Sequence, residues 1–162
     1  MSEKKFNTEK VFATKSALSF EEDISKSTSK NESRVSVHGA PGTGPLSYDW
    51  TKKVVVQLSD AECMSVIAVF LGCAKSFEAK SHGPQKDKQF SIEVQSKGVF
   101  YIKVGQLNNG MFAVPVSREG AFKIPPVFLK QVQENRPWMS CGEIMQMVKD
   151  VSSCLAAASA SQ

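Results

Sequence analysis

No run of 18 apolar residues occurs anywhere in this sequence of 162 residues, and this absence predicts that no helix spans a membrane. The first ten residues, MSEKKFNTEK, contain no hydrophobic signal segment, and Glu3 and Glu9 are atypical of an organellar transit peptide. We therefore expect an intracellular protein with no membrane partner.

Cysteine is scarce and scattered. Cys63, Cys73, Cys141 and Cys154 lie far apart in apolar segments and form no CxxC pair. A disulfide framework or a zinc site needs cysteines at closer and more regular spacing. The pattern predicts reduced, buried thiols, with no metal and no other cofactor.

The residue types of an active site are equally few. The two histidines, His38 and His82, each precede a glycine in a predicted loop. Among the carboxylates near the middle of the chain, Glu62 is assigned below to a helix cap and Asp49 lies in a turn. No Ser/His/Asp or Cys/His arrangement has a credible spacing, so the sequence predicts a protein that is not an enzyme.

A phosphate-binding P-loop is almost present but incomplete. In GAPGTGPLS, residues 39–47, Gly39 and Gly44 have the separation of that motif, but Pro45 stands where the motif requires a lysine. The segment also leads into a predicted strand and not into a helix. It is interpreted as a Gly/Pro turn, which excludes a nucleotide site of this class.

The composition is that of an ordinary folded domain with a slight excess of positive charge. Hydrophobic residues make up 41% of the chain and charged residues 22%, and the length suits one domain with a sizeable core. The net charge of +4 and the pI near 8.9 permit an anionic partner without requiring one. Residues 1–10, residues 21–33 and the C-terminal AAASASQ are polar or small and are expected to be loose.

The strongest local pattern is a strand followed by a capped helix. Residues 54–58, VVVQL, form the short apolar and β-branched run typical of a buried strand. Ser59 and Glu62 then have the spacing of a capping box, which begins a helix. One apolar stripe runs through residues 63–71, and Gly72 is suited to end the helix.

The remaining chain alternates between strand and turn patterns before it ends in helices. Residues 11–20, VFATKSALSF, are expected to form one strand, with Leu18 and Phe20 facing the core and Lys15 at the centre of the open face. RVSVH, residues 34–38, is its expected hairpin partner. Further strands are expected within residues 73–82, 89–95, 99–107 and 111–116.

Turn and cap patterns connect these elements. Asn109-Gly110 predicts a two-residue hairpin turn before the last strand. A helix is expected to begin at Pro126, and Ser140 with Glu143 predicts the cap of a final amphipathic helix. Hairpin-length connections dominate, which favours an α+β fold with mainly antiparallel sheet.

Lysines and aromatic residues are interleaved along the predicted strands. Residues 75–103 contain six lysines against three acidic residues, a local excess of +3. Such a surface suits single strands, because unstacked bases lie on rings while ammonium groups meet phosphates. The alternative interpretation places most of the aromatic residues in the core and most of the lysines on an ordinary solvated surface.

Three segments, in this order, resemble the Whirly family of single-stranded-DNA-binding proteins: TKSALS (14–19), YDWTKKVVVQLSDAE (48–62) and FAVPVS (112–117). They are similar to the family's KGKAALS strand, to its YDW-x-[KR]-[KR] strand leading into an LS-x-x-E helix start, and to its FTVPVT strand. The kinetoplastid mitochondrial guide-RNA-binding proteins share this fold and bind RNA, so the resemblance favours neither polymer.

The resemblance implies two four-stranded antiparallel β-sheets packed at a steep angle, with C-terminal helices. It frames residues 11–136 as a Whirly-like nucleic-acid-binding domain. A flexible tail, residues 1–10, precedes the domain; an amphipathic helix, residues 137–158, and a flexible tail, residues 159–162, follow it. It further implies a homo- or hetero-tetramer, in the mitochondrion or the nucleus.

The resemblance also implies a set of nucleic-acid-binding residues. Lys15 is expected to contact a phosphate or a base edge, with help from Ser16. Trp50 and Lys52 are expected to share one face of a strand, where Trp50 either stacks on a base or packs in the core. Lys86 and Lys88, in the basic segment HGPQKDK, are further expected contacts, which follow from the excess of lysine in residues 75–103 and not from the resemblance.

The leading hypothesis is therefore a protein that binds single-stranded DNA, RNA or both with little sequence specificity. It would act in organellar or nuclear DNA and RNA maintenance or in transcription. The alternative is a non-catalytic structural or scaffold subunit of a larger protein or ribonucleoprotein assembly, which docks through the final helix.

Overall fold

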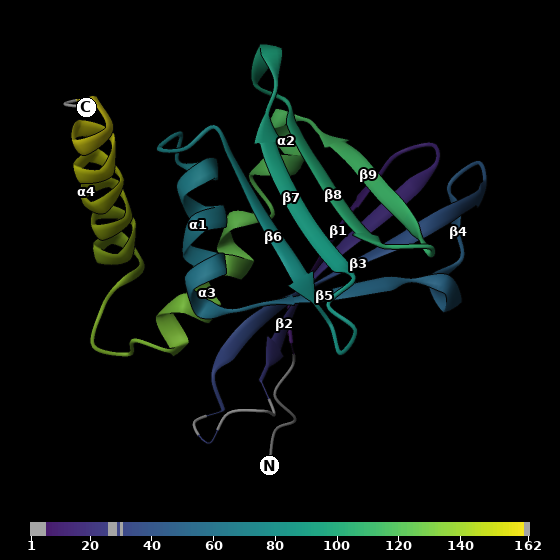
Figure 1. Ribbon diagram of the computed structural model, residues 1–162, viewed down its shortest axis with the longest axis horizontal. Coiled ribbons are helices and arrows are strands. Elements are labelled where there is room, and N and C mark those ends of the chain that lie inside the picture. Colours follow the sequence, from purple (N-terminus) through teal and green to yellow (C-terminus); the bar gives the residue numbers. More distant parts are fainter. Residues whose placement is uncertain (1–5, 26–28, 30, 161–162) are drawn as a thin grey trace.

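The computed structural model describes residues 6–25, 29 and 31–160, so parts of both predicted tails and of the polar segment 21–33 lie outside the described residues. The described strands form two antiparallel sheets, and the strands of one sheet cross those of the other steeply (Figure 1). The expected α+β fold, with two packed antiparallel sheets and C-terminal helices, is confirmed.

In the first sheet β1, β2 and β3 lie side by side, and β3 pairs along its far side with β5 and, near its end, with the short β4. These strands are β1 (Thr8–Phe12), β2 (Ser16–Ile24), β3 (Ser33–Gly44), β4 (Ser47–Tyr48) and β5 (Val54–Leu58). The second sheet follows chain order: β6 (Ser76–His82), β7 (Lys88–Val94), β8 (Phe100–Gln106) and β9 (Gly110–Val116). Two 3-10 turns, η1 (Trp50–Lys52) and η2 (Ser96–Gly98), precede β5 and β8.

The helices gather at one side of the sheets. They are α1 (Asp60–Phe70), α2 (Arg118–Ala121), α3 (Pro125–Glu134) and α4 (Cys141–Ala160). α1 and α3 lie next to the sheets, whereas α4 stands outermost (Figure 1). None of the described helices has the length and apolarity that a bilayer crossing requires.

The ordered elements reach into both segments that were expected to be flexible tails. β1 begins at Thr8 and pairs with β2 from there, so residues 8–10 belong to the first sheet. At the other end α4 extends to Ala160. The division of the chain into a domain of residues 11–136 and a separate terminal helix stays a prediction.

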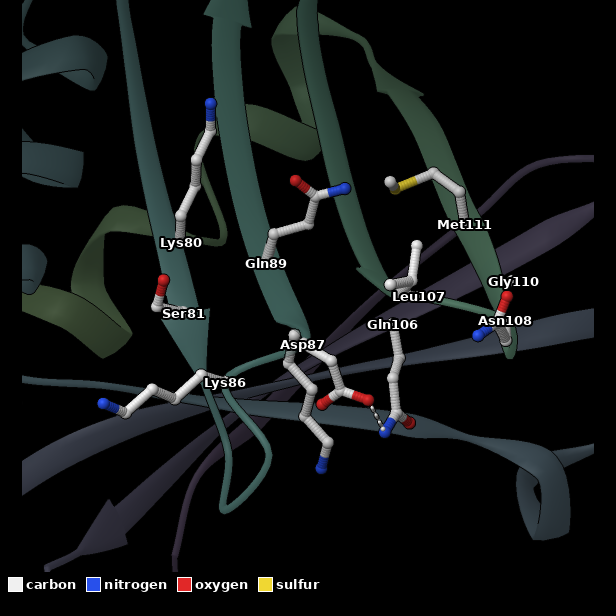
Figure 2. Close-up of a pocket in the computed structure, with 11 residues that line it drawn as sticks. Lys80, Ser81, Lys86, Asp87, Gln89, Gln106, Leu107, Asn108, Gly110 and Met111 are labelled. Carbon is white, nitrogen blue, oxygen red and sulfur yellow. Dashed lines mark hydrogen bonds between the residues drawn. The ribbon is translucent and has the colours of Figure 1, made fainter.

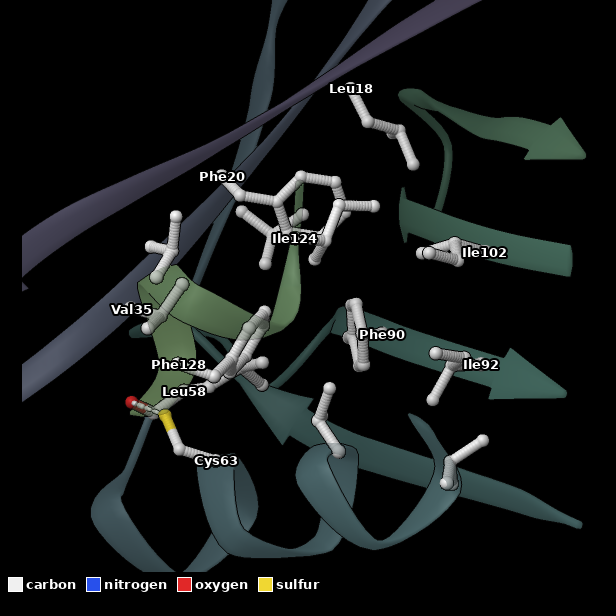
Figure 3. Packing of buried hydrophobic residues seen from close by; sticks show 14 of the residues in the cluster. Leu18, Phe20, Val35, Leu58, Cys63, Phe90, Ile92, Ile102, Ile124 and Phe128 are labelled. Atoms are coloured by element: carbon white, nitrogen blue, oxygen red, sulfur yellow. Dashed lines mark hydrogen bonds between the residues drawn. The ribbon is translucent and has the colours of Figure 1, made fainter. Parts of the chain in front are cut away.

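The hydrophobic core fills the space between the two sheets and helices α1 and α3 (Figure 3). Phe20 of β2, Phe90 of β7 and Phe128 of α3 are its largest side chains, each at most 1% exposed. The rings of Phe20 and Phe128 meet edge to face, with centroids 6.0 Å apart. One phenylalanine from each sheet and one from a helix thus hold the three layers together.

A buried glutamine attaches α3 to the first sheet. Gln131 is 3% exposed, and its Nε2 donates hydrogen bonds to the backbone oxygens of Asp23 and Arg34, each at 2.7 Å. These oxygens lie at the ends of β2 and β3 near α3. Because a buried amide without partners is costly, this side chain fixes where α3 sits along the sheet.

The predicted strand and capped helix are both present. β5 alternates, with Val54, Val56 and Leu58 buried. The Ser59 backbone N–H donates to Glu62 Oε2 at 2.8 Å and the Glu62 N–H donates to Ser59 Oγ at 3.3 Å, which completes the capping box of α1. After the helix, Gly72 has a φ of +76°, the left-handed conformation that ends it.

The four cysteines are free thiols, but they are not all buried. Burial raises the pKa of Cys63 to about 12, so this thiol stays protonated and unreactive. Cys141 and Cys154 are exposed, so the expectation that every cysteine is buried is wrong. Their apolar neighbours belong to α4, which packs on the domain through one side only.

The expected first strand, residues 11–20, is in fact two strands. β1 and β2 are joined by a tight turn over residues 13–15, in which Ala13 N donates to Ser16 O at 2.8 Å. The unbroken alternation of apolar residues concealed this turn, because Thr14 and Lys15 also fit a strand. Lys15 consequently lies at a hairpin tip and not at the centre of a sheet face.

The expected Gly/Pro turn over residues 39–47 is confined to Pro45 and Leu46, since β3 continues to Gly44 and β4 begins at Ser47. A Cβ atom at Gly42 would lie 2.8 Å from the backbone oxygen of Thr14. The small residue therefore lets β3 approach the β1–β2 turn, where Gly42 N donates to Lys15 O at 2.8 Å. Glycine here serves close packing and not chain reversal.

Two boundaries differ by one residue. α3 begins at Pro125 and not at Pro126, because a proline at the first helical position loses no hydrogen bond. Residues 107–109 form a three-residue turn with Gly110 already in β9, so the predicted two-residue Asn109-Gly110 turn is wrong.

Candidate nucleic-acid interface

The outer face of the first sheet carries a row of small side chains flanked by large ones. The register places Phe12, Ala17 and Ala40 opposite one another on β1, β2 and β3, and opposed residues of an antiparallel sheet share a face. Both alanines are completely buried although this face points away from the core. Larger side chains must therefore cover them from outside.

Aromatic side chains from both flanks supply that cover. The rings of Phe12, on β1, and Tyr48, on β4, lie 5.4 Å apart, although β2 and β3 separate their strands. The Tyr48 hydroxyl also donates to the backbone oxygen of Ala13 at 2.6 Å. Only small residues such as Ala17 and Ala40 leave room for two rings to meet above the sheet.

A cation–π contact extends this cluster. Lys10 Nζ lies 4.8 Å from the centre of the Trp50 ring. Lys10 and Phe12 are two residues apart on β1 and thus lie on the same face. We call Lys10, Phe12, Tyr48 and Trp50 the aromatic platform. Its Phe12 side chain is 53% exposed, so an apolar ring faces solvent.

The sequence-predicted residues of the first sheet lie around this platform with different exposures. Lys15 is exposed in the β1–β2 turn, whose backbone is joined to Gly42. Ser16 is only 6% exposed and offers little surface to a ligand. Lys52 is open to solvent, with its Nζ 3.9 Å from Asp49 Oδ2.

Trp50 and Lys52 do not share a strand face, as had been expected. Both belong to the 3-10 turn η1, which Asp49 caps by accepting a hydrogen bond from Thr51 N at 3.0 Å. The β-like composition of this segment hid the cap. Trp50 is only partly buried and lies under Lys10, so it belongs to the outer face and not to the central core.

Lys86 and Lys88 lie on the other sheet, in a cleft at the ends of its strands (Figure 2). Lys86 is part of the β6–β7 loop and Lys88 is the first residue of β7. The structure therefore divides the six predicted residues into two groups, one at the platform and one at this cleft.

Charge is unevenly distributed over the outer face of the first sheet. The platform contains Lys10 and is flanked by Lys15 and Lys52, whereas Glu21 and Asp23 follow further along β2. Burial opposes ionisation of Asp23, but hydrogen bonds from Ser36 and Gln57 outweigh it and lower the pKa of this carboxyl. The platform end is thus the end that attracts polyanions.

His38 lies between these two regions. Its Nε2 is 3.4 Å from Glu21 Oε2, and the side chain is nearly buried. Burial lowers the pKa of His38, and Lys53 and Lys10 add to that effect against the opposing pull of Glu21 and Asp23. The imidazole is therefore neutral near pH 7 and adds no positive charge to the face.

The described residues offer no metal site. Within them no group of three or more histidine, cysteine, aspartate or glutamate side chains is placed to hold a metal ion. His82 contacts Glu62 Oε1 at 2.7 Å, but Glu62 already caps α1. This pair therefore joins β6 to the start of the helix.

Sequence reasoning missed Lys10 and Phe12. Lys10 lies in the segment that the sequence predicts to be a flexible tail, and the alternation in residues 11–20 predicts that Phe12 faces the core, whereas its ring is exposed. An indirect signal was present in the paired alanines, because a strand that carries small residues on its outer face leaves space for a covering layer.

The sequence and the structure of this chain can now be compared with those of known proteins. The sequence pattern of the Whirly transcription factor family matches residues 11–123. This chain belongs to the Whirly family. Whirly proteins are a non-catalytic family of single-stranded-DNA-binding transcriptional regulators. No curated protein sequence gives a match.

Solved Whirly structures share the fold. The plant transcriptional regulator PBF-2 is 24% identical with a TM-score of 0.65, over 85% of this chain and 86% of that chain. WHY1 from Arabidopsis thaliana is 20% identical with a TM-score of 0.61, over 81% and 91%. WHY3 from Arabidopsis thaliana is 18% identical with a TM-score of 0.60, over 97% and 99%. At these identities the likeness concerns the fold alone.

Proposed function

We propose that this Whirly protein binds single-stranded nucleic acid on the outer face of its first sheet. The observation that carries the proposal is the aromatic platform, in which Phe12 and Tyr48 meet above Ala17 and Ala40. Bases that are not paired can lie on these rings, while the phosphates between them meet Lys15 and Lys52. A duplex keeps its bases stacked inside and cannot use the rings.

Such a surface supports binding with little sequence readout. A ring stacks on any base, and an ammonium group meets any phosphate. The side chains of the platform present few hydrogen-bonding groups, since the Tyr48 hydroxyl is already bonded to Ala13. The protein would serve DNA or RNA maintenance or transcription in an organelle or the nucleus, as a homo- or hetero-tetramer.

Replacing Lys15 and Lys52 together by alanine should weaken binding of single-stranded DNA and RNA and should flatten its salt dependence. Each lost phosphate contact lowers the slope of log K against log salt by about 0.7 for a single strand. Phe12→Ala should instead lower the affinity roughly tenfold and leave that slope unchanged, because it removes stacking and no charge. Anisotropy titrations at several salt concentrations, with labelled single strands and duplex, measure both quantities.

The matched control is Lys97→Ala with Lys123→Ala, which removes the same charge from exposed positions away from the platform. If the control and the Lys15/Lys52 variant lose equal affinity, only net charge matters and the platform assignment is wrong. If the folded wild-type chain binds neither single-stranded DNA nor single-stranded RNA, the proposed function itself is wrong.

The scaffold alternative draws support from α4. Ile144 and Val148 pack on the domain, but Val151 and Leu155 continue the same stripe while 55% and 66% exposed. They line an apolar cleft of about 500 Å³ together with side chains of α1 and β6. An exposed apolar stripe of this kind favours a subunit contact.

Val151→Glu with Leu155→Glu should therefore lower the molecular mass seen by light scattering at micromolar concentration, because two carboxylates would have to be buried in the contact. The control is Ser153→Glu with Cys154→Glu, which adds the same charge to exposed positions of α4 outside that cleft. An unchanged mass in the first variant would contradict a role for this stripe in assembly.

A further inference from the structure

A cleft of about 440 Å³ lies at the loop end of the second sheet (Figure 2). β6 contributes Lys80, β7 contributes Gln89 and β9 contributes Met111, while the β8–β9 turn contributes Leu107 and Asn108. The volume lies in the range of clefts that hold small ligands. Its lining combines apolar side chains, amides and ammonium groups.

Met111 forms the apolar floor of the cleft, and its side chain can lie flat because a glycine lies beneath it. Met111 crosses β8 at Gly105, where a Cβ atom would be 2.6 Å from the Met111 Sδ. The thioether therefore lies directly on the backbone of β8. Met111 is 47% exposed and Leu107 is 72% exposed, so the floor remains open to a flat apolar ligand.

Polar groups surround this floor on two sides. Gln89 reaches from β7 toward Met111, and Asn108 stands in the turn on the opposite side (Figure 2). Each amide can both donate and accept a hydrogen bond, as contact with the edge of a base requires. Gln106 is already committed, since its Nε2 donates to Asp87 Oδ2 at 2.9 Å.

The rim carries more positive than negative charge. Lys80, Lys86 and Lys88 line the cleft against the single carboxylate of Asp87. The Lys80 ammonium also lies 3.2 Å from Glu78 Oε2, outside the cleft, which offsets part of its charge. In Figure 2 the Lys86 side chain extends away from Met111, so its ammonium group stands at the outer rim of the cleft.

We propose that this cleft is a nucleotide subsite, in which a base lies on Met111 and Leu107 and the adjoining phosphate meets Lys86 and Lys80. The inference rests on the proposed function, because it assigns one nucleotide of the bound single strand to the second sheet. Gln89 and Asn108 contact the base edge, so this position has more base preference than the platform.

Met111→Glu tests the subsite, because it puts a carboxylate on the floor and leaves the rest of the exposed edge strand unchanged. We expect roughly tenfold weaker binding of single-stranded DNA or RNA, because the base loses its apolar contact and the adjoining phosphate meets a like charge. Met111→Leu keeps an apolar floor and should bind like the wild type. Val94→Glu, an exposed apolar position at the opposite end of the same sheet, is the control for added negative charge.

A strand with one 5-iodouracil, placed in turn at each position, locates the base directly. Photocrosslinking at one position should label the peptide that contains Leu107 and Met111, and Met111→Glu should reduce that yield. Competition with uridine monophosphate distinguishes a free nucleotide from a nucleotide of the strand.

The outcomes separate this inference from the proposed function. Unchanged affinity in Met111→Glu, together with weaker binding in Phe12→Ala, would overturn the subsite and leave the platform standing. Saturation of the cleft by the mononucleotide without any effect of Met111→Glu on strand binding would also overturn the assignment to the strand. If no single strand binds to the wild type at all, the proposed function fails first.

Discussion

Phe128→Ala should lower the free energy of unfolding by about 4 kcal/mol, the largest stability effect that we expect from a single substitution. The Phe128 side chain is fully buried where α3 packs on β2 and β3, and its ring lies edge to face with Phe20. Removing the ring loses the free energy gained by burying a large apolar group. It also leaves a cavity, because the surrounding helix and strands cannot all move in to fill it. Urea titration followed by circular dichroism measures the change.

The control for this prediction lies six residues earlier in the chain. Phe122 is 69% exposed, and the Arg118 Cζ atom lies 5.8 Å from the centre of its ring. Phe122→Ala should therefore change stability by about 0.5 kcal/mol or less. Equal losses of stability in the two variants would contradict the assignment of Phe128 to the hydrophobic core.

Asp60→Asn should destabilise the protein by about 3 kcal/mol at pH 7, because it leaves the Arg136 charge unpaired in a partly buried place. Arg136 Nη1 donates to Asp60 Oδ1 at 2.7 Å, and Asn135 Nδ2 donates to the same oxygen at 2.8 Å. The two charged side chains are only 15% and 23% exposed. This network joins the start of α1 to the end of α3.

The effect should depend on pH in a defined direction. Burial tends to raise the pKa of Asp60, but the hydrogen bonds from Arg136 and Asn135 outweigh it, so the pKa lies below the ordinary value of 3.8. A carboxyl with a depressed folded-state pKa stabilises the fold above its unfolded pKa and loses that contribution as pH falls through the folded value. The difference between wild type and Asp60→Asn should be constant above about pH 5 and should shrink below pH 4.

Asp150→Asn is the matched control, because Asp150 is exposed on α4 and accepts a single hydrogen bond from Gln146 at 2.9 Å. Its substitution should have little effect at any pH. A difference for Asp60→Asn that stays constant down to pH 3 would show that the carboxylate charge contributes nothing, and that only packing is lost.

Both sites matter for function because α3 and α1 hold the sheets that carry the two candidate surfaces. Gln131 and Asn135 of this region bond to backbone atoms of β2 and β3, including Ser33 at the start of β3. The platform is built on the other end of these strands. Stability variants in α3 should therefore be checked for folding before any binding loss is assigned to the surface.

Local sequence patterns were sufficient where the interactions are local. The Ser59–Glu62 cap, the Gly72 helix end and the Ser140–Glu143 cap all join residues within a few positions, and each is present as predicted. The alternation in residues 89–95 and 99–107 likewise predicted β7 and β8, since one buried face imposes a period of two. These signals require no knowledge of distant contacts.

Patterns failed where distant chain segments decide the conformation. The turn at residues 13–15 is held by contacts from Gly42 and Tyr48, some 30 residues away. In the sequence alone Gly42 predicts a turn. The structure shows that glycine is needed there because the backbone oxygen of Thr14 leaves no room for a Cβ atom. Without those neighbours, residues 11–20 form one good strand and residues 39–47 form one good turn.

The sequence by itself determined the two-sheet α+β fold, its capped helices and its family, because these depend on residue order, periodicity and recognisable motifs. Only the tertiary structure decided which lysines and rings gather into surfaces. Phe12 and Tyr48 meet because two alanines on intervening strands are small, and Met111 lies flat because Gly105 lies under it. A binding surface of this kind is a property of neighbouring strands, whose register and spacing only the folded chain establishes.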